Sequence, residues 1–365
     1  MNTVVVTGAA GSVGCRVVSA LLERDDVDRV VGIDVVQSLG RHPKLATVLS
    51  DLGGPGAVDE VALLGAFRGA TSVIHLAWAA ADTKGLSSED RRRVSSNNCR
   101  STSAVLELVA LSGVRSIVNV SSATVYGAWA DNDVPLSEGS RILPNPELTF
   151  AVAKAEAERL ISEWTDTHSS VAVAVLRPSV TVGSGDRPLY KALEATRTPR
   201  VASEGRLVQY LHVDDLASAV VFAWENRLDG VFNVAPDSGI AEEEARRLAG
   251  GIATVGMPGR LASALAALGW KFWRRGVPPE ALAYATHPWV VSPDRLVDAG
   301  WNPEYSSAEA LVATDARWHW DDLPPGRRQN LNTLLALSAA AGVVASLGAL
   351  VLSRRRRARR SASHY

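Results

Sequence analysis

The chain has 365 residues, 47% of them hydrophobic, which is enough apolar material for a large buried core in one or two domains. Its formal net charge is −1, but residues 354–360 hold six arginines, so the rest of the chain carries −7. A body of that sign is a poor nucleic-acid binder, and we exclude this function class. Cys15 and Cys99 cannot form a disulfide framework, and the seven histidines lack the spacing of metal ligands.

The first predicted strand leads into a glycine-rich turn. Residues 4–7 read Val-Val-Val-Thr, and three glycines follow before a segment whose apolar residues have helical spacing. Strand, turn and helix in this order are the context of a dinucleotide-binding loop. Gly8 lets the chain leave the strand sharply, Gly11 lets the backbone approach a pyrophosphate, and Gly14 lets the helix pack closely. The N–H groups at the start of the helix are then available to the phosphates.

An acidic residue follows the second apolar run. Residues 30–33 end in Asp34, about 20 residues after the glycine turn, where an acid holds the ribose 2′-hydroxyl of NAD. A carboxylate there also repels the 2′-phosphate of NADP. We therefore predict NAD, with NADP the less favoured cofactor.

Further apolar runs alternate with segments of helical spacing, which indicates an α/β fold with a parallel, doubly wound sheet of the Rossmann type. The run at 116–120 delivers residues 121–127 at its carboxyl end, where open α/β sheets bind ligands. We predict further strands at 46–49, 71–77, 171–176 and 231–234, and helices at 58–67, 88–112 and 150–158.

The predicted domains follow from the same pass along the chain. Residues 1–239 form the NAD-binding domain, with insertions that belong to the substrate lobe. Residues 240–320 are a smaller, mainly helical and tryptophan-rich substrate lobe, and 321–330 a linker. A membrane segment at 331–353 and an arginine-rich tail at 354–365 complete the chain.

These motifs together resemble the extended short-chain dehydrogenase/reductase family of the NAD-dependent epimerase/dehydratase type, over roughly residues 1–320. The resemblance implies that Ser122 takes the catalytic serine or threonine position and that Lys154 grips the nicotinamide ribose. The motifs that carry it, in family order, are the glycine loop, Asp51-Leu52, His75-Leu76-Ala77, Asn98, residues 121–127, Lys154, Arg177-Pro178 and residues 212–215. The predicted cofactor-binding residues are Thr7, Gly8, Gly11, Ser12, Val13, Gly14, Asp34, Asp51, Leu52, Leu76, Ala77, Asn98, Ser122, Lys154 and Pro178.

One position departs from the family pattern. The family's catalytic tyrosine lies four residues before the lysine, and this chain has Phe150 there. The tyrosine exchanges a proton with the substrate while hydride moves, a contribution of about 10²–10⁴-fold that phenylalanine cannot make. Tyr126 is the obvious substitute, but family members carry a tyrosine in this turn beside the catalytic one, so we expect it to serve packing and the turn.

Two further departures concern the substrate. Where nucleotide-sugar epimerases of the family place an arginine and an aspartate for the diphosphate, this chain has Val208 and Gln209, and Val180 replaces a usual asparagine. An unpaired, desolvated diphosphate is costly, so we predict an oxidoreductase on a lipophilic alcohol or ketone, similar to the hydroxysteroid dehydrogenases. A non-catalytic NAD-binding sensor or membrane scaffold, which Phe150 supports, and a nucleotide-sugar epimerase or dehydratase are the alternatives.

The last part of the chain predicts membrane association. Residues 334–352 are 19 residues without a charge, which just reach across a hydrocarbon core of about 30 Å. Small residues recur at Ser338, Gly342 and Ser346, which permits close helix–helix approach. A cytoplasmic NAD domain with a single span would export the arginine cluster against the positive-inside tendency, whereas a shallow insertion would leave it on anionic headgroups. We expect a cytoplasmic domain bound to membrane lipid, with homodimer formation left open.

Overall fold

The centre of the fold is a seven-stranded sheet in which every pair of neighbouring strands is parallel. The computed structural model describes residues 2–37, 39–54, 60–79, 88–183, 206–236, 239–248 and 281–313. The strands, in the spatial order β10-β6-β5-β4-β1-β2-β3, are β10 (Gly230–Val234), β6 (Ala172–Pro178), β5 (Ser116–Val120), β4 (Ser72–His75), β1 (Thr3–Thr7), β2 (Arg29–Asp34) and β3 (Leu45–Leu49).

The strand order reverses direction beside β1. The chain runs outward from β1 to β2 and β3, then crosses to β4 on the other side of β1 and continues outward to β10. This arrangement is a doubly wound Rossmann-type sheet, so the predicted fold class is confirmed. Ligands of such sheets bind at the carboxyl ends of the strands, at the point of reversal.

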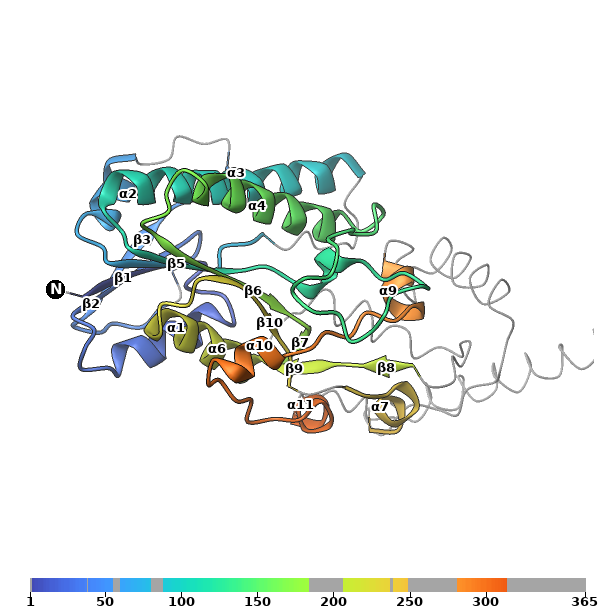
Figure 1. The fold of residues 1–365 in the computed structure, drawn as a ribbon. Coiled ribbons are helices and arrows are strands. Elements are labelled where there is room, and N and C mark those ends of the chain that lie inside the picture. Colours follow the sequence, from blue (N-terminus) through green and yellow to red (C-terminus); the bar gives the residue numbers. More distant parts are fainter. Residues whose placement is uncertain are drawn as a thin grey trace, which may run out of the picture. The chain divides into compact units, whose positions relative to one another are not determined.

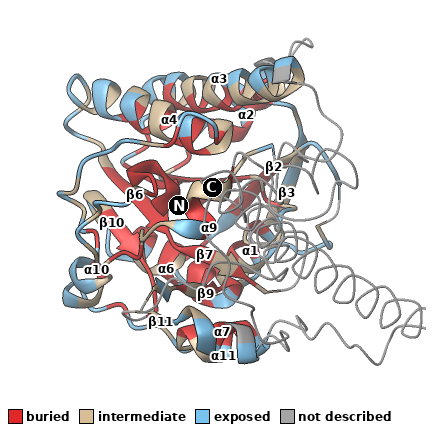
Figure 2. Ribbon diagram, turned by 90° about the vertical axis from the view of Figure 1, so that its right-hand side faces the viewer, coloured by how far each residue is buried: buried red, intermediate tan, exposed pale blue. Residues whose placement is uncertain are grey.

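Helices cover both faces of the sheet (Figure 1). The helices α2 (Glu60–Phe67), α3 (Ser88–Ser112) and α4 (Thr149–Thr165) lie on one face, and α1 (Gly14–Leu22) and α6 (Val213–Glu225) lie on the other. Side chains alternate between the faces with the period of a strand. Val4 and Val6 pack into the core with α1 and α6, while Val5 packs into the core with α2 and α3. All five residues of β1 are buried for this reason, and strands of the large sheet such as β6 and β10 are coloured red, as buried, in Figure 2.

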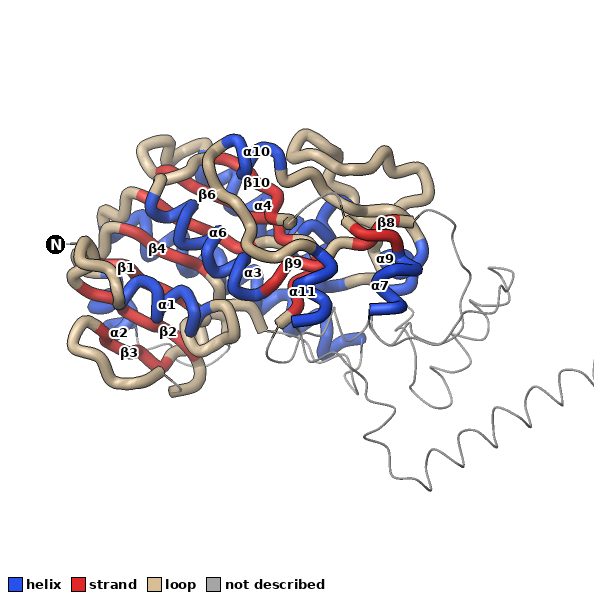
Figure 3. Tube along the Cα trace, turned by 90° about the horizontal axis from the view of Figure 1, so that it is seen from below, coloured by secondary structure: helices blue, strands red, loops and turns tan. Residues whose placement is uncertain are grey.

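Most of the remaining, shorter elements lie around two small two-stranded sheets (Figure 3). The helix at Asp294–Asp298 instead packs beside β10 of the large sheet. The described residues after 240 are mostly helical, and Ala245 of α7 packs with Leu311 of α11 and with Val208. These elements therefore adjoin strands from before residue 239. The elements are β7 (Val180–Val182), β8 (Leu207–Val208), β9 (Tyr210–His212), β11 (Ile240–Ala241), α7 (Glu242–Leu248), α9 (Leu282–Thr286), α10 (Asp294–Asp298) and α11 (Ser307–Ala313).

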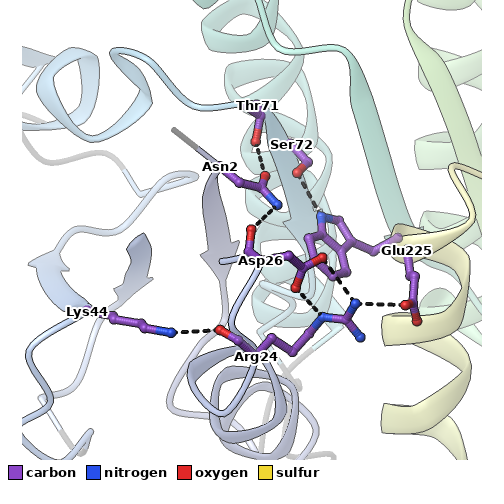
Figure 4. Close-up of polar contacts among 8 residues, drawn as sticks. Asn2, Arg24, Asp26, Lys44, Thr71, Ser72 and Glu225 are labelled. Atoms are coloured by element: carbon purple, nitrogen blue, oxygen red, sulfur yellow. Dashed lines mark hydrogen bonds and ion pairs between the residues drawn. The ribbon is translucent and has the colours of Figure 1, made fainter. Parts of the chain in front are cut away.

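The amino ends of the central strands are closed by polar contacts (Figure 4). Trp224 of α6 donates its indole N–H to Ser72 Oγ at 2.7 Å. The Arg24 guanidinium, just after α1, lies 2.8 Å from Asp26 and 2.7 Å from Glu225 at the end of α6. These contacts hold α1 and α6 at the amino edge, and they leave the opposite edge for a ligand.

Within the part of the chain that the structure describes, no helix is both long enough and apolar enough to span a membrane. The predicted linker at 321–330, membrane segment at 331–353 and tail at 354–365 all lie outside the described residues.

Candidate functional site

The glycine turn leads from β1 to α1 and lies against the segment that follows β4. Gly8 has φ +67°, and a Cβ atom there would lie 2.6 Å from the backbone nitrogen of Ala77. A Cβ atom at Gly14 would lie 2.1 Å from the carbonyl oxygen of Gly8. Neither position has room for a side chain, because both obstructing atoms belong to the backbone. The close helix–strand approach predicted from the glycines is present.

The start of α1 is available to an anion. Val13 is the N-cap residue and makes no side-chain hydrogen bond to the N–H groups of the first turn. Gly11 is exposed beside it, and a Cβ atom there would lie 3.2 Å from Gly8 O. Unpaired N–H groups and the positive end of the helix dipole bind phosphates, so this turn fits the pyrophosphate of a dinucleotide.

Asp34 lies against the glycine turn. Its Oδ2 accepts a hydrogen bond of 2.9 Å from Ala10 N, and its Oδ1 accepts one of 2.7 Å from Val35 N. These bonds fix the carboxylate at the end of β2, where it remains partly exposed. Oδ1 accepts a second hydrogen bond of 3.3 Å from Val36 N, so Oδ2 is the oxygen that keeps a further lone pair for a ribose hydroxyl. The position therefore suits the predicted contact with the adenosine ribose of NAD.

Several of the predicted cofactor residues bond the backbone of the segment after β4. The Thr7 side chain is fully buried; its Oγ1 lies 2.7 Å from His75 Nδ1 and accepts a hydrogen bond from Ala77 N. The Asn98 amide bonds the backbone N–H and C=O of Ala79 at 2.8 and 3.1 Å. Both side chains fix the segment after β4. Leu52 packs in the core after β3, and Asp51 beside it is exposed.

Ser122 lies at the carboxyl end of β5 as the N-cap of a short 3₁₀ helix, Ala123–Tyr126. Its Oγ accepts hydrogen bonds from Thr124 N at 3.2 Å and Thr124 Oγ1 at 3.0 Å. Because Ser122 Oγ is the acceptor in both bonds, its hydroxyl proton remains available to donate to a substrate oxygen. The geometry suits the predicted role of polarising a carbonyl or hydroxyl.

Lys154 of α4 reaches the same edge of the sheet. Its Nζ donates a hydrogen bond of 2.8 Å to Val120 O, two residues before Ser122, and the side chain is buried. The ring of Trp78 covers this ammonium, with 3.6 Å between Nζ and the ring centroid. Burial lowers the pKa of Lys154 from 10.5 to about 7, although the charge of Glu158 opposes the shift.

Phe150 lies one turn before Lys154 and contributes a ring without a hydroxyl. It is partly buried and packs with Leu148, Ala151 and Tyr284. Its ring meets Trp78 edge-on, with centroids 6.1 Å apart and planes at 83°. The position that the family resemblance gives to the catalytic tyrosine is therefore part of an apolar wall.

The hydroxyl of Tyr126 is hydrogen-bonded to two buried side chains. Tyr126 is 2% exposed, and its hydroxyl donates to Asn233 Oδ1 at 2.7 Å and accepts from Arg177 Nη1 at 2.8 Å. Burial raises its pKa. Tyr284 is also buried, and its hydroxyl donates to Thr124 O at 2.7 Å. Neither phenol is free to replace the one that Phe150 lacks.

The positions used to predict a lipophilic substrate have structural roles. The Gln209 amide donates to Val291 O at 2.8 Å and accepts from Val291 N at 2.9 Å, so it joins the chain between β8 and β9 to the chain before α10. Val180 is 5% exposed and packs in a small core. His212 caps α6 through its Nδ1. No group of three metal-ligating side chains occurs in the described ranges.

Together, the carboxyl ends of β1, β2, β4 and β5 bring the glycine turn, Asp34, Ala77, Ser122 and Lys154 to one edge of the sheet. Pro178 closes β6 on the same side. The sequence analysis missed Trp78, which directly follows His75-Leu76-Ala77 and could be found only as a large aromatic residue in a segment expected to run along the cofactor.

A family comparison matches this arrangement. The model of the NAD dependent epimerase/dehydratase family matches residues 4–235. The chain belongs to this family. The predicted resemblance is confirmed, and NAD is the cofactor that the family name, the glycine turn and Asp34 all indicate.

Curated relatives include a probable UDP-arabinose 4-epimerase 3 of Oryza sativa subsp. japonica, 30% identical over 215 residues, which are 56% of this chain and 50% of the relative. UDP-arabinose 4-epimerase 1 of Arabidopsis thaliana is 27% identical over 282 residues, 66% of this chain and 65% of the relative. The matched part of the chain thus spans only half to two thirds of these relatives.

Solved structures share the fold of this family member. A UDP-galactose 4-epimerase superposes with a TM-score of 0.60 at 22% identity, over 86% of this chain and 97% of that one. A dTDP-glucose 4,6-dehydratase from Streptomyces venezuelae, with NAD bound, gives 0.62 at 18% identity, over 88% and 97%. Sequence identities of this size show a shared fold and nothing about activity.

Proposed function

We propose that this family member binds NAD and a nucleotide sugar, and that it inverts one carbinol centre of the sugar as an epimerase does. The observation that carries the proposal is the placement of Ser122 and Lys154 together at the carboxyl end of β5, across the edge from the glycine turn. The names of the relatives favour a nucleotide sugar over the lipophilic alcohol or ketone predicted from Val208, Gln209 and Val180. We therefore prefer the epimerase alternative.

The chemistry that NAD supplies when bound is reversible hydride acceptance from a carbinol carbon, and return to the other face leaves both oxidation states unchanged. Ser122 donates its hydroxyl proton as a hydrogen bond to the reacting sugar oxygen. The proton of that sugar hydroxyl needs an acceptor, which Phe150 cannot be. We assign this role to the Lys154 amine, which is partly neutral near pH 7 because burial lowers its pKa.

A second candidate function is NAD and sugar-nucleotide binding without turnover, for sensing or scaffolding. The observation that favours it is Phe150, whose ring packs against Trp78 and offers no proton donor. A phenol contributes about 10²–10⁴-fold to such reactions, and a protein without it loses that factor.

The deciding experiment compares the wild type with Phe150→Tyr. Each purified full-length protein, supplied with NAD, is incubated with UDP-arabinose, UDP-galactose and dTDP-glucose, and the epimers are separated by chromatography. Val152→Tyr is the matched control, because Val152 is an exposed residue of the same helix. Wild-type conversion of any sugar supports the epimerase. An inactive wild type beside an active Phe150→Tyr variant supports binding without turnover. If neither protein binds a sugar nucleotide by calorimetry, both candidates are wrong.

A further inference from the structure

We propose that Trp78 competes with the nicotinamide ribose for Lys154, so that the adenosine half of NAD supplies most of the binding free energy in this protein. The inference rests on the NAD-binding part of the proposed function and deepens it. It assigns a specificity-determining role to a residue that the family motifs do not include.

The position of Trp78 is fixed on both sides by its backbone neighbours. Ala77 N donates to Thr7 Oγ1 at 3.2 Å, and the backbone of Ala79 makes two hydrogen bonds with the buried Asn98 side chain. A residue between two anchored neighbours has little freedom to move its Cα atom. The fold therefore fixes the Trp78 backbone, and the indole ring lies over Lys154 Nζ.

Two sides of the Lys154 ammonium are already occupied. An ammonium has three N–H donors, and Val120 O takes one of them at 2.8 Å. The Trp78 ring lies across another side, at 3.6 Å from Nζ to its centroid, which is a close cation–π contact. A ribose hydroxyl bonded to Nζ would have its oxygen about 2.8–3.0 Å from this atom. An oxygen approaching from the side that Trp78 covers cannot come that close while the indole remains there.

Phe150 extends this cover beside Trp78. Its ring meets Trp78 edge-on, and its centroid lies 5.9 Å from Lys154 Nζ. Two rings around one ammonium exclude water from it, which agrees with the lowered pKa of Lys154. Moving Trp78 away therefore breaks both a cation–π and an aromatic contact. The free energy of these contacts is subtracted from the binding free energy of any ligand that bonds Lys154.

The hydrogen bonds that hold the adenosine half of the site do not involve Trp78 or Phe150. The glycine turn and Asp34 hold their geometry through bonds among Gly8, Ile33, Ala10 and Val35. The affinity for a ligand that ends at the pyrophosphate, such as ADP, therefore does not depend on Trp78. The ratio of NAD affinity to ADP affinity is thus a direct measure of the competition.

The test titrates NAD and ADP separately into the full-length wild type, Trp78→Ala and Trp78→Phe by calorimetry. We expect similar affinities for both ligands in the wild type, and a gain of about tenfold for NAD in Trp78→Ala, about 1.4 kcal/mol, with ADP affinity within twofold of wild type. Trp78→Phe, which keeps a smaller ring, falls between. Adding Lys154→Met to Trp78→Ala removes the gain.

The matched control is Trp164→Ala, which removes a tryptophan of α4, the helix of Lys154, that stacks on His168 instead. It leaves the NAD to ADP ratio unchanged. Retained ADP binding reports that each variant is folded. An unchanged ratio, or weaker NAD binding, in Trp78→Ala overturns the proposal. Failure of the epimerase proposal shows in the sugar assay and does not alter this ratio, so the two failures are distinguishable.

Discussion

Arg177 Nη2 lies 2.6 Å from Glu158 Oε2, and both side chains are buried, with 4% and 6% of their surface exposed. The pair joins β6 to α4, the helix that carries Phe150 and Lys154. Glu158 also accepts a hydrogen bond from Ser121, the neighbour of Ser122. One buried carboxylate therefore sets the distance between the helix and the loop that together form the site.

Replacing Arg177 with Met is expected to lower the free energy of unfolding by about 3–5 kcal/mol, because Glu158 remains as an uncompensated buried charge. The double variant Arg177→Met/Glu158→Gln recovers part of that loss. Urea unfolding measures both. Arg159→Met is the control on the same helix, since exposed Arg159 pairs with partly exposed Glu156 and exposed Glu163 and its loss should have little effect. Equal losses for Arg177→Met and Arg159→Met would contradict the argument.

The glycine turn predicts a second contrast. Gly8→Ala is expected to destabilise the protein at least twice as much as Gly69→Ala, measured by urea unfolding. Both glycines have positive φ, +67° and +74°, so both substitutions carry a strain of about 1 kcal/mol. Only at Gly8 does the new methyl group also meet backbone, 2.6 Å from Ala77 N, whereas nothing lies within 4 Å at Gly69. Similar losses at the two sites would mean that the close approach of β1 and β4 is absent.

Asp34 is expected to set the choice of cofactor. The wild type should bind NAD at least tenfold more tightly than NADP, about 1.4 kcal/mol, because the carboxylate repels a 2′-phosphate. Asp34→Asn should reduce this ratio toward one, as measured by calorimetric titration of both cofactors. Asp166→Asn, which removes an exposed acid at the end of α4, is the control and should keep the wild-type ratio. Tighter NADP binding by the wild type would refute the role of Asp34.

His75 makes stability depend on pH. Burial lowers the pKa of His75 from 6.5 to about 3, and the charge of Lys154 acts in the same direction. Below pH 6.5 the unfolded chain therefore binds a proton that the native protein does not. The stability contributed by the neutral ring is complete above pH 6.5 and is lost as the pH falls toward 3, by about 1.4 kcal/mol per pH unit.

His75→Gln is expected to be less stable than the wild type at pH 7.5, because the contacts with Thr7 and Thr102 change, and to lose less stability between pH 6.5 and 4. Urea unfolding at several pH values gives the slope. The exposed His42 serves as control, since His42→Gln should keep the wild-type slope. A His75→Gln slope equal to that of the wild type would show that His75 titrates normally in the folded protein.

The uncharged run at 334–352 is proposed to bind membrane lipid. Expressed full-length protein should sediment with membranes and need detergent for release, because 19 apolar and small residues favour hydrocarbon over water. Replacing both Val343 and Val344 with Lys places two charges in the middle of the run and should move the protein to the soluble fraction. Replacing both with Leu is the matched control. A wild type that stays soluble without detergent contradicts the proposal.

Local patterns in the sequence were sufficient to predict the sheet and the glycine turn. Val4, Val5 and Val6 predict a strand buried on both faces, and that burial needs no knowledge of distant residues. The spacing from Gly8 to Asp34 likewise fixes which strand ends meet, since β1 and β2 are consecutive along the chain. These parts of the fold were predicted because the neighbours in space are also neighbours in sequence.

The contacts around Lys154 could not be predicted in this way. Trp78 and Lys154 are far apart in the chain and come from different elements, so only the packed structure shows the ring over the ammonium. Gln209 illustrates the same point: the sequence shows only that it replaces a diphosphate-binding residue of the family, whereas the structure shows its amide bonded to the backbone of Val291. Side-chain partners across elements depend on rotamers and packing, which no local pattern encodes.

The central position of β1 has a consequence for synthesis. Its partner β2 follows within 30 residues, but β4, its other neighbour, ends at His75. At a translation rate of about 5–20 residues per second, the nascent chain carries an unpaired edge of three consecutive valines for roughly 3–14 s. Such edges invite pairing with other chains. We expect the emerging polypeptide to depend on ribosome-associated chaperones during that interval, although the finished fold exposes none of those valines.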